Sequence, residues 1–154
     1  QGSLSNLAGG VLILLLKPFR VGDYIITAGA EGTVMSIDIF YTRIATTDNK
    51  VVVIPNGTIS NSNVTNTTKQ DERMLVLEFT VSLDANIEEV KTEIMKLIES
   101  NERILHEMNR CVVVDKLTPV NIKMQAKAWT KSEDYWDVKY LLLEQISIVL
   151  QGFR

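Results

Sequence analysis

The chain has 154 residues with 16 basic and 19 acidic side chains, a formal net charge of −3 and a single cysteine. This balance argues against a polyanion such as a nucleic acid as partner, because such partners need a clustered basic surface. The lone Cys111 excludes an internal disulfide, and its apolar surroundings in the sequence predict a small buried side chain.

The first 22 residues, QGSLSNLAGGVLILLLKPFRVG, are the most apolar part of the chain. Helical spacing gives them a leucine-rich face and an opposite face of small and polar residues: Leu4, Leu7, Val11 and Leu14 against Gly2, Asn6, Gly9 and Ile13. The apolar run Leu7–Leu16 is shorter than the about 20 residues that span a membrane. Pro18 ends the helix, and Lys17 and Arg20 suit the cytoplasmic side of a membrane. The stretch is therefore an interfacial helix, the last part of a membrane segment, or a buried helix of a soluble domain.

Short β-rich runs separated by turns follow: Tyr24–Thr27, Gly32–Phe40, Thr42–Thr47 and Val51–Ile54. Ala28-Gly29 and Asp48-Asn49 are typical turn dipeptides, and Pro55-Asn56-Gly57 ends the last run. The spacing predicts a small barrel or sandwich. The polar segment Thr58–Gln70 is predicted to be a connector.

The remaining chain has the order β-α-β-β-α. We predict strands around Leu75–Val81, Cys111–Asp115 and Asn121–Thr130, and helices over about Asn86–Ser100 and Ser132–Gln151. Asn86 and Glu89 are spaced as a capping box, and Gly152 is placed as a C-terminal cap. The last helix presents an apolar stripe of Trp136, Tyr140, Leu143, Ile146 and Leu150. This order is that of a ferredoxin-like split β-α-β unit.

Residue patterns for enzymatic chemistry are missing from the sequence. His106 is the only histidine, and no second histidine or cysteine stands at ligand spacing from it. The glycines form no phosphate-binding motif, and the pairs Glu88-Glu89 and Glu133-Asp134 lie at helix starts, where they complement the helix dipole. We therefore predict no enzyme, no cofactor and no metal.

Several separated motifs resemble the bacterial mechanosensitive channel of small conductance family: QGSLSNLAGGV, KPFRVGDYI, Glu31-Gly32-Thr33-Val34 and VVVIPNG at Val51–Gly57. The resemblance implies an α+β fold in three parts. These are the second half of the pore-lining helix over 1–21, a small, five-stranded Sm-like β-barrel domain over 22–68 and a ferredoxin-like α/β domain over 69–154. We expect the chain to be a fragment, with the first two membrane helices, the start of the pore helix and a terminal barrel strand outside it.

The function implied by this resemblance is that of a tension-gated, weakly selective ion channel that releases small solutes and ions on hypo-osmotic shock. The implied assembly is a homo-heptamer in the bacterial inner membrane, with most of this chain on the cytoplasmic side. Its partners are then other copies of itself, membrane lipids, permeating ions and small osmolytes, and no nucleic acid.

Site residues follow from their place in the matching motifs. They are Gly2 and Gly10 for a helix bend linked to gating, Gly9 for helix packing, Asn6, Asn56 and Gly57 for coupling of the helix to the β domain, and Lys17 and Arg20 for the membrane interface. The sequence departs from the family at Leu16 and Lys17, where an aromatic residue and an arginine are frequent. The lipid-facing end of the helix is therefore less well defined.

Two other interpretations remain. The first is a soluble oligomeric module that binds or senses a small molecule, with the first helix as an oligomer contact. The second is an RNA-binding Sm-like ring, which the acidic balance and the lack of clustered basic and aromatic residues disfavour. Two or more apolar segments of about 20 residues upstream in the gene would favour the channel over the soluble module.

Overall fold

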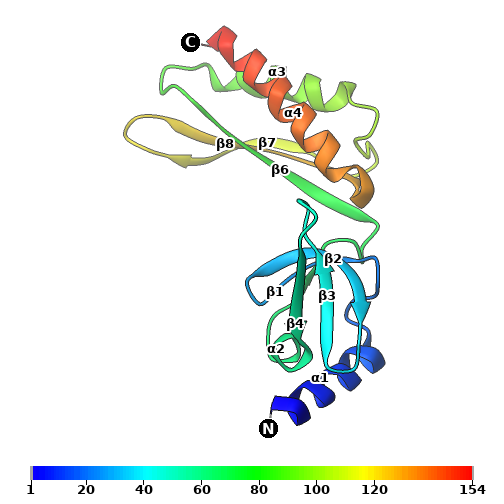
Figure 1. Cartoon of the computed structure of the whole chain (residues 1–154). Coiled ribbons are helices and arrows are strands. Elements are labelled where there is room, and N and C mark those ends of the chain that lie inside the picture. Colours follow the sequence, from blue (N-terminus) through cyan, green and yellow to red (C-terminus); the bar gives the residue numbers. More distant parts are fainter. Residues whose placement is uncertain (1, 154) are drawn as a thin grey trace. The chain divides into compact units, whose positions relative to one another are not determined.

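The computed structural model describes residues 2–153 and divides the chain into two compact units, Gln1–Gln70 and Asp71–Arg154 (Figure 1). Gln1 and Arg154, the outer ends of the first and third predicted parts, lie outside the described residues. Each unit combines helices with one antiparallel sheet, which confirms the predicted α+β class.

The first unit begins with helix α1 (Gly2–Leu16), followed by a five-stranded antiparallel sheet in the order β4-β3-β2-β1-β5. Its strands are β1 (Tyr24–Thr27), β2 (Ala30–Ile37), β3 (Tyr41–Ala45), β4 (Val51–Pro55) and β5 (Thr65–Asn66). The four β-rich runs of the sequence all form strands. The prediction was wrong after Pro55, because the turn and the connector there contain a short helix, α2 (Asn56–Ser60), and the short strand β5.

Both predicted turn dipeptides form tight turns. Ala28 and Gly29 have φ values of 51° and 76° and join the paired residues Thr27 and Ala30, as in a two-residue hairpin of type I′. Asn49 has a φ of 63°, and the turn is closed by a hydrogen bond of 2.8 Å from the Thr46 amide to the Lys50 carbonyl.

The core of the first unit draws on both of its helices, on the turn after α1 and on strands β1 to β4. Its buried apolar residues are Ile13, Phe19, Ile25, Val34, Ile44, Ile54 and Ile59. Ile13 comes from α1 and Phe19 from the turn that follows, so the first helix and its exit are built into the same core as the sheet.

The second unit contains β6 (Glu72–Val81), α3 (Ile87–Ser100), β7 (Cys111–Leu117), β8 (Ile122–Lys131) and α4 (Tyr135–Leu150). The strands form a three-stranded sheet in the order β6-β8-β7, and Figure 1 shows both helices on the same side of it. Alternate strand residues such as Leu75, Leu77 and Met124 point toward the buried residues of the helices, Val90, Ile94, Ile98, Val138, Leu142 and Ile146. This arrangement is the predicted ferredoxin-like order.

The Asn86 cap of α3 is confirmed, since its side chain accepts a hydrogen bond of 3.3 Å from the Glu89 amide. Other details of the second unit differ from the prediction. Trp136 and Tyr140 are 45% and 63% exposed, because α4 buries Val138 and Leu142 instead. The helix ends in a 3₁₀ turn, Gln151–Phe153, that runs through Gly152. Cys111 is half-buried rather than buried.

Ala28 is held in a left-handed conformation that an alanine adopts at a cost of about 1 kcal/mol. We expect Ala28→Asn to raise the free energy of unfolding of the first unit by about that amount, because asparagine is favoured in type I′ turns. Native-state hydrogen exchange of the β2 and β3 amides measures this change. Ala30→Gly, which places glycine in strand β2, is the opposite control, and equal or lower protection in Ala28→Asn would contradict the assignment of the turn.

Candidate functional site at the first helix

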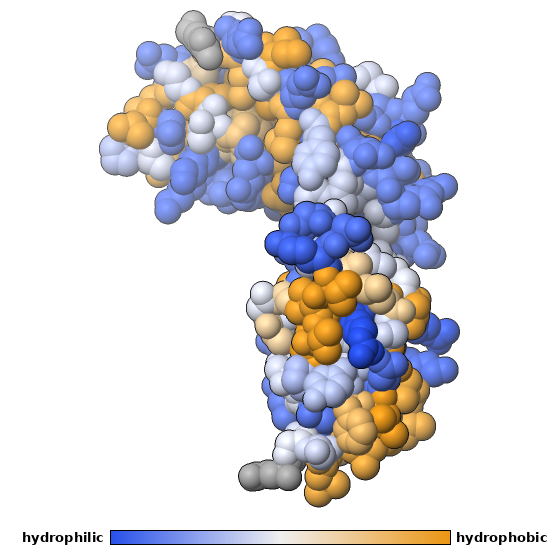
Figure 2. All heavy atoms as spheres, in the orientation of Figure 1, coloured by the Kyte–Doolittle hydropathy of each residue, from blue (hydrophilic) through white to orange (hydrophobic). Residues whose placement is uncertain are grey.

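Helix α1 has one buried face. Gly9, Gly10 and Ile13 are buried within the first unit, whereas six apolar residues of the helix are exposed: Leu4, Val11, Leu12, Leu14, Leu15 and Leu16. Figure 2 shows this exposed apolar surface around α1. The predicted face of small and polar residues is therefore the one that packs on the unit.

The close approach of α1 depends on the two central glycines. A Cβ at Gly9 would lie 2.5 Å from the Asn56 carbonyl oxygen and 2.8 Å from the Gly57 nitrogen. A Cβ at Gly10 would overlap the Ile39 carbonyl oxygen and lie 2.8 Å from Asn56 Nδ2. Real side chains do not occupy such positions, so the α1 backbone lies directly on the start of α2 and on the loop between β2 and β3.

Asn56 is fully buried, with 0% exposure, and its polar side-chain atoms all have partners. Its Oδ1 accepts a hydrogen bond of 2.7 Å from Thr42 Oγ1, and its Nδ2 donates to the carbonyl oxygens of Asp38 at 2.8 Å and Ile39 at 3.1 Å. Its backbone amide donates to the Phe40 carbonyl at 2.9 Å. Asn56 thereby fixes the β2–β3 loop on which Gly10 rests.

Asn6 connects α1 to α2 directly. Its Oδ1 accepts a hydrogen bond of 2.9 Å from the Gly57 amide across 51 residues of sequence. The first turn of a helix has free amides, and α2 has no side-chain cap of its own because Pro55 occupies the N-cap position. Asn6 of one helix therefore caps another helix.

Gly57 leaves room for this contact. A Cβ at Gly57 would lie 2.5 Å from Ser5 Oγ and 2.9 Å from Asn6 Oδ1. Any larger residue would push α1 away from α2 or remove the hydrogen bond from Asn6.

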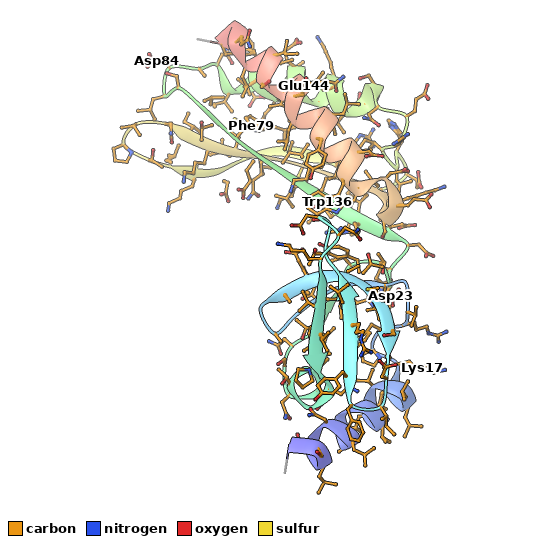
Figure 3. All side chains as sticks on the ribbon, viewed as in Figure 1. Lys17, Asp23, Phe79, Asp84, Trp136 and Glu144 are labelled. Atoms are coloured by element: carbon orange, nitrogen blue, oxygen red, sulfur yellow. The ribbon has the colours of Figure 1, made fainter. Side chains whose placement is uncertain are left out.

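The turn after α1 forms the other end of the site. Lys17 has a φ of 48° and its amide donates to the Ile13 carbonyl at 2.9 Å, which ends the helix in a left-handed cap. The side chains of Lys17 and Arg20 are exposed, and Figure 3 labels Lys17 and Asp23 in this region. Asp23 Oδ2 accepts hydrogen bonds of 2.9 Å from the Arg20 amide and from Asn66 Nδ2.

The pKa of Asp23 lies below its ordinary value of 3.8. Burial of the carboxylate acts in the opposite direction and is the largest single influence, but several others together outweigh it. These are hydrogen bonds from Asn66, from the Arg20 amide and from Thr68, and the positive charge of Arg20. The turn is therefore built around an ionised Asp23.

The structure brings five of the eight predicted site residues together: Asn6, Gly9, Gly10, Asn56 and Gly57. Gly2 lies apart, with nothing within 4 Å of a Cβ placed on it, and Lys17 and Arg20 lie at the opposite end of α1. α1 is a continuous helix through Gly10. Three residues with contacts in this region were not predicted from the sequence: Thr42, Ile39 and Asn66. Thr42 was one of the alternating strand residues, and Asn66 was one polar residue among many in the connector.

None of the helices described over residues 2–153 is both long and apolar enough to cross a membrane. Over the same residues, no group of three or more histidine, cysteine or acidic side chains is placed to hold a metal ion.

Comparison with known protein families gives two matches that together cover nearly the whole chain. Residues 2–69 match the β-domain of mechanosensitive ion channels, and residues 75–151 match the C-terminal domain of the mechanosensitive ion channel MscS. The first match includes every residue of the site around α1.

Individual relatives agree with these matches. The small-conductance mechanosensitive channel of Edwardsiella ictaluri is 35% identical over 152 residues, which are 99% of this chain and 53% of the relative. The crystal structure of Helicobacter pylori MscS in its closed state superimposes with a TM-score of 0.88 at 29% identity, over 97% of this chain and 59% of that one. Arabidopsis thaliana MSL1, at 17% identity and a TM-score of 0.77, shares the fold over 99% of this chain and 57% of its own. The chain thus spans about half the length of the curated relatives that it matches.

The close packing of Gly10 predicts that alanine destabilises the first unit at this position and not at the open position of Gly2. We expect Gly10→Ala to destabilise the first unit by about 2 kcal/mol, because the new methyl group overlaps the Ile39 carbonyl. Gly2→Ala in the same helix has open space and should cause no loss of stability. Hydrogen exchange of the amides in β2 and β3 reports both effects. A similar response of the two variants would show that α1 does not pack as described.

The lowered pKa of Asp23 predicts a pH dependence of stability. Because the folded pKa lies below the unfolded one, the ionised side chain stabilises the fold above about pH 3.8, and this contribution is lost as the pH falls through the folded pKa. We expect Asp23→Asn to lower the midpoint of thermal unfolding by roughly 2 to 4 °C at pH 7. The difference should shrink below pH 3.8. Circular dichroism melting curves at pH 7 and pH 3 test this, and a difference of constant size at both pH values would exclude the proposed role of the charge.

Proposed function

Because this chain belongs to the MscS family of mechanosensitive ion channels, we propose that it is the pore-helix end and cytoplasmic vestibule wall of a tension-gated channel. The whole protein then conducts ions and small solutes with weak selectivity and releases them on hypo-osmotic shock. The observation that carries this proposal is the packing of α1, which combines an exposed apolar face with a glycine face that lies on the start of α2 and on the β2–β3 loop.

In this proposal residues 1–21 are the second half of the pore helix, 22–68 the β domain and 69–154 the α/β domain. The exposed leucines of α1, with Leu15 and Leu16 at 73% and 74% exposure, face lipid or other helices of the channel. Lys17 and Arg20 lie at the lipid headgroups on the cytoplasmic side, as basic residues do at the ends of membrane helices. Gly2, at the start of α1 and with open space around a Cβ placed on it, is the more favourable position for a bend, since Gly10 is held against Ile39.

Membrane tension favours whichever state occupies the larger area in the bilayer. Tension acts on the membrane helices, so the cytoplasmic part responds only through contacts that differ between the states. We assign this role to the hydrogen bond of 2.9 Å from the Gly57 amide to Asn6 Oδ1, because it joins α1 to α2 within the first unit. A net value of about 1 kcal/mol for a hydrogen bond is enough to shift a gating equilibrium severalfold.

Self-assembly into a ring, seven-membered as the resemblance implies, completes the proposal. The first unit supports it by exposing large apolar side chains besides those of α1: Ile26, Met35, Ile39, Phe40, Val51 and Val53. Exposed apolar surface of this kind marks sites of association. We place the assembled channel in the bacterial inner membrane.

The direct test is electrical. The whole protein is expressed in cells that lack their own tension-gated channels, and patches of their membrane are recorded under rising suction. Stepwise currents that increase with tension are expected. If the protein is present in the membrane and no such current appears, the channel proposal fails and a soluble or ligand-controlled relative becomes the better explanation.

We further expect Asn6→Ala to change the tension threshold and the decay of the current at constant tension, because the Gly57 amide loses its acceptor. Asn6→Asp keeps an acceptor oxygen and should stay closer to the wild-type protein. Ser3→Ala, at an exposed position of α1, serves as control. A threshold and decay in Asn6→Ala equal to those of Ser3→Ala would exclude the coupling role of Asn6.

A further inference from the structure

The short strand β5 places Asn66 between the exit of α1 and the segment that leads to the second unit. Its backbone pairs with Ile25 of β1, which is fully buried in the core. The second unit begins at Asp71, five residues further along the chain. Asn66 therefore lies close to the end of the first unit, just before the chain enters the second.

The two ends of the Asn66 amide serve two different segments. Nδ2 donates to the Pro18 carbonyl at 3.1 Å and to Asp23 Oδ2 at 2.9 Å, both in the turn after α1. Oδ1 accepts from the amides of Thr68 at 3.1 Å and Lys69 at 3.0 Å, both in the segment before Asp71. We call these four contacts the Asn66 bridge.

Thr68 closes the network around the Asn66 bridge. Its hydroxyl accepts a hydrogen bond of 3.1 Å from the Tyr24 amide and lies 3.1 Å from Asp23 Oδ1 and 3.2 Å from Asn66 Oδ1. A hydroxyl has one proton, so it donates to one of these two oxygens at a time. The Lys69 amide donates its hydrogen bond of 3.0 Å to Asn66 Oδ1. Asp23 therefore reaches the Lys69 amide by two routes, through the side chain of Asn66 and through the hydroxyl of the neighbouring Thr68. Only the Asn66 route ends in a hydrogen bond to that amide.

We propose that Asn66 is a positioning residue that couples the exit turn of α1 to the segment entering the second unit. A shift of Pro18 and Asp23 moves the Nδ2 end of the Asn66 side chain. Because the amide group is planar and rigid, its Oδ1 end moves with it and alters the hydrogen bonds from the Thr68 and Lys69 amides. The two segments then become ordered or loosened together. This coupling rests on the proposed function only in its last step, that the channel uses it to pass the state of its membrane helices to the cytoplasmic α/β domain.

The first test is residue-resolved hydrogen exchange on the whole protein in lipid nanodiscs. We expect Asp23→Asn to speed exchange of the Lys69 amide about threefold, and Asn66→Ala to speed it about fivefold. In the Asn66→Ala background, Asp23→Asn should add little further at Lys69, because the connecting amide is gone and only the Thr68 hydroxyl still contacts Asp23. Asn63→Ala, at an exposed asparagine of the same segment, should leave Lys69 unchanged.

Two exchange results overturn the coupling. One is an unchanged Lys69 amide in Asp23→Asn, with faster exchange confined to the exit turn. The other is an effect of Asp23→Asn at Lys69 that is just as large without the Asn66 side chain. Both results are independent of channel activity.

The last step is tested by recording the same variants under constant tension. Asn66→Ala should change the rate at which the current decays, and Asn63→Ala should not. Unchanged decay in Asn66→Ala, together with the exchange coupling, overturns the use of the bridge in gating. Absence of any tension-activated current in the wild-type protein instead contradicts the proposed function and leaves the exchange result standing.

Discussion

The buried amide of Asn56 is the constraint on which the site in the first unit depends. Leaving a buried polar atom without a partner costs more free energy than a typical hydrogen bond contributes, so every polar atom of the amide must be hydrogen-bonded. Thr42 and the carbonyls of Asp38 and Ile39 satisfy it, and in doing so they fix the β2–β3 loop. The surface on which α1 lies is thus defined by one side chain at the start of α2.

The close packing of α1 follows from this surface. The Asn56 and Ile39 carbonyls occupy the space that side chains at positions 9 and 10 of α1 would need. The helix can therefore approach this closely only because both residues are glycine. With the backbones this near, Asn6 reaches the Gly57 amide and Ile13 enters the core. The leucines on the other side are left exposed, which suits a helix shared between a folded domain and a membrane.

Much of this arrangement could be predicted from the sequence, for physical reasons that differ between elements. Regular alternation of apolar residues identified β6 and β8, and the Asn86–Glu89 spacing identified the start of α3. Family resemblance pointed to Asn6 and Gly57, which are in contact; what the contact does in gating stays a prediction.

The missed features are those that depend on partners distant in the sequence. Strand β5 has only two residues, too few to show a strand periodicity, and it is held by the side chain of Asn66 and by pairing with β1. Helix α2 is capped by Asn6 of another helix and has no local side-chain cap, so its own sequence does not predict where it begins. On α4, Trp136 and Tyr140 share a helical stripe with Ile146, but the sheet is covered by Val138 and Leu142.

The central claim is that the contact between α1 and α2 in the first unit changes when the membrane is stretched. The most direct measurement is the hydrogen exchange of the Gly57 amide in the whole protein, in liposomes at osmotic balance and in liposomes swollen by dilution. The account predicts faster exchange at Gly57 under tension, with the amides of β2 and β3 unchanged, because the Asn6 acceptor is lost as α1 moves. Equal exchange at Gly57 in both conditions would contradict it.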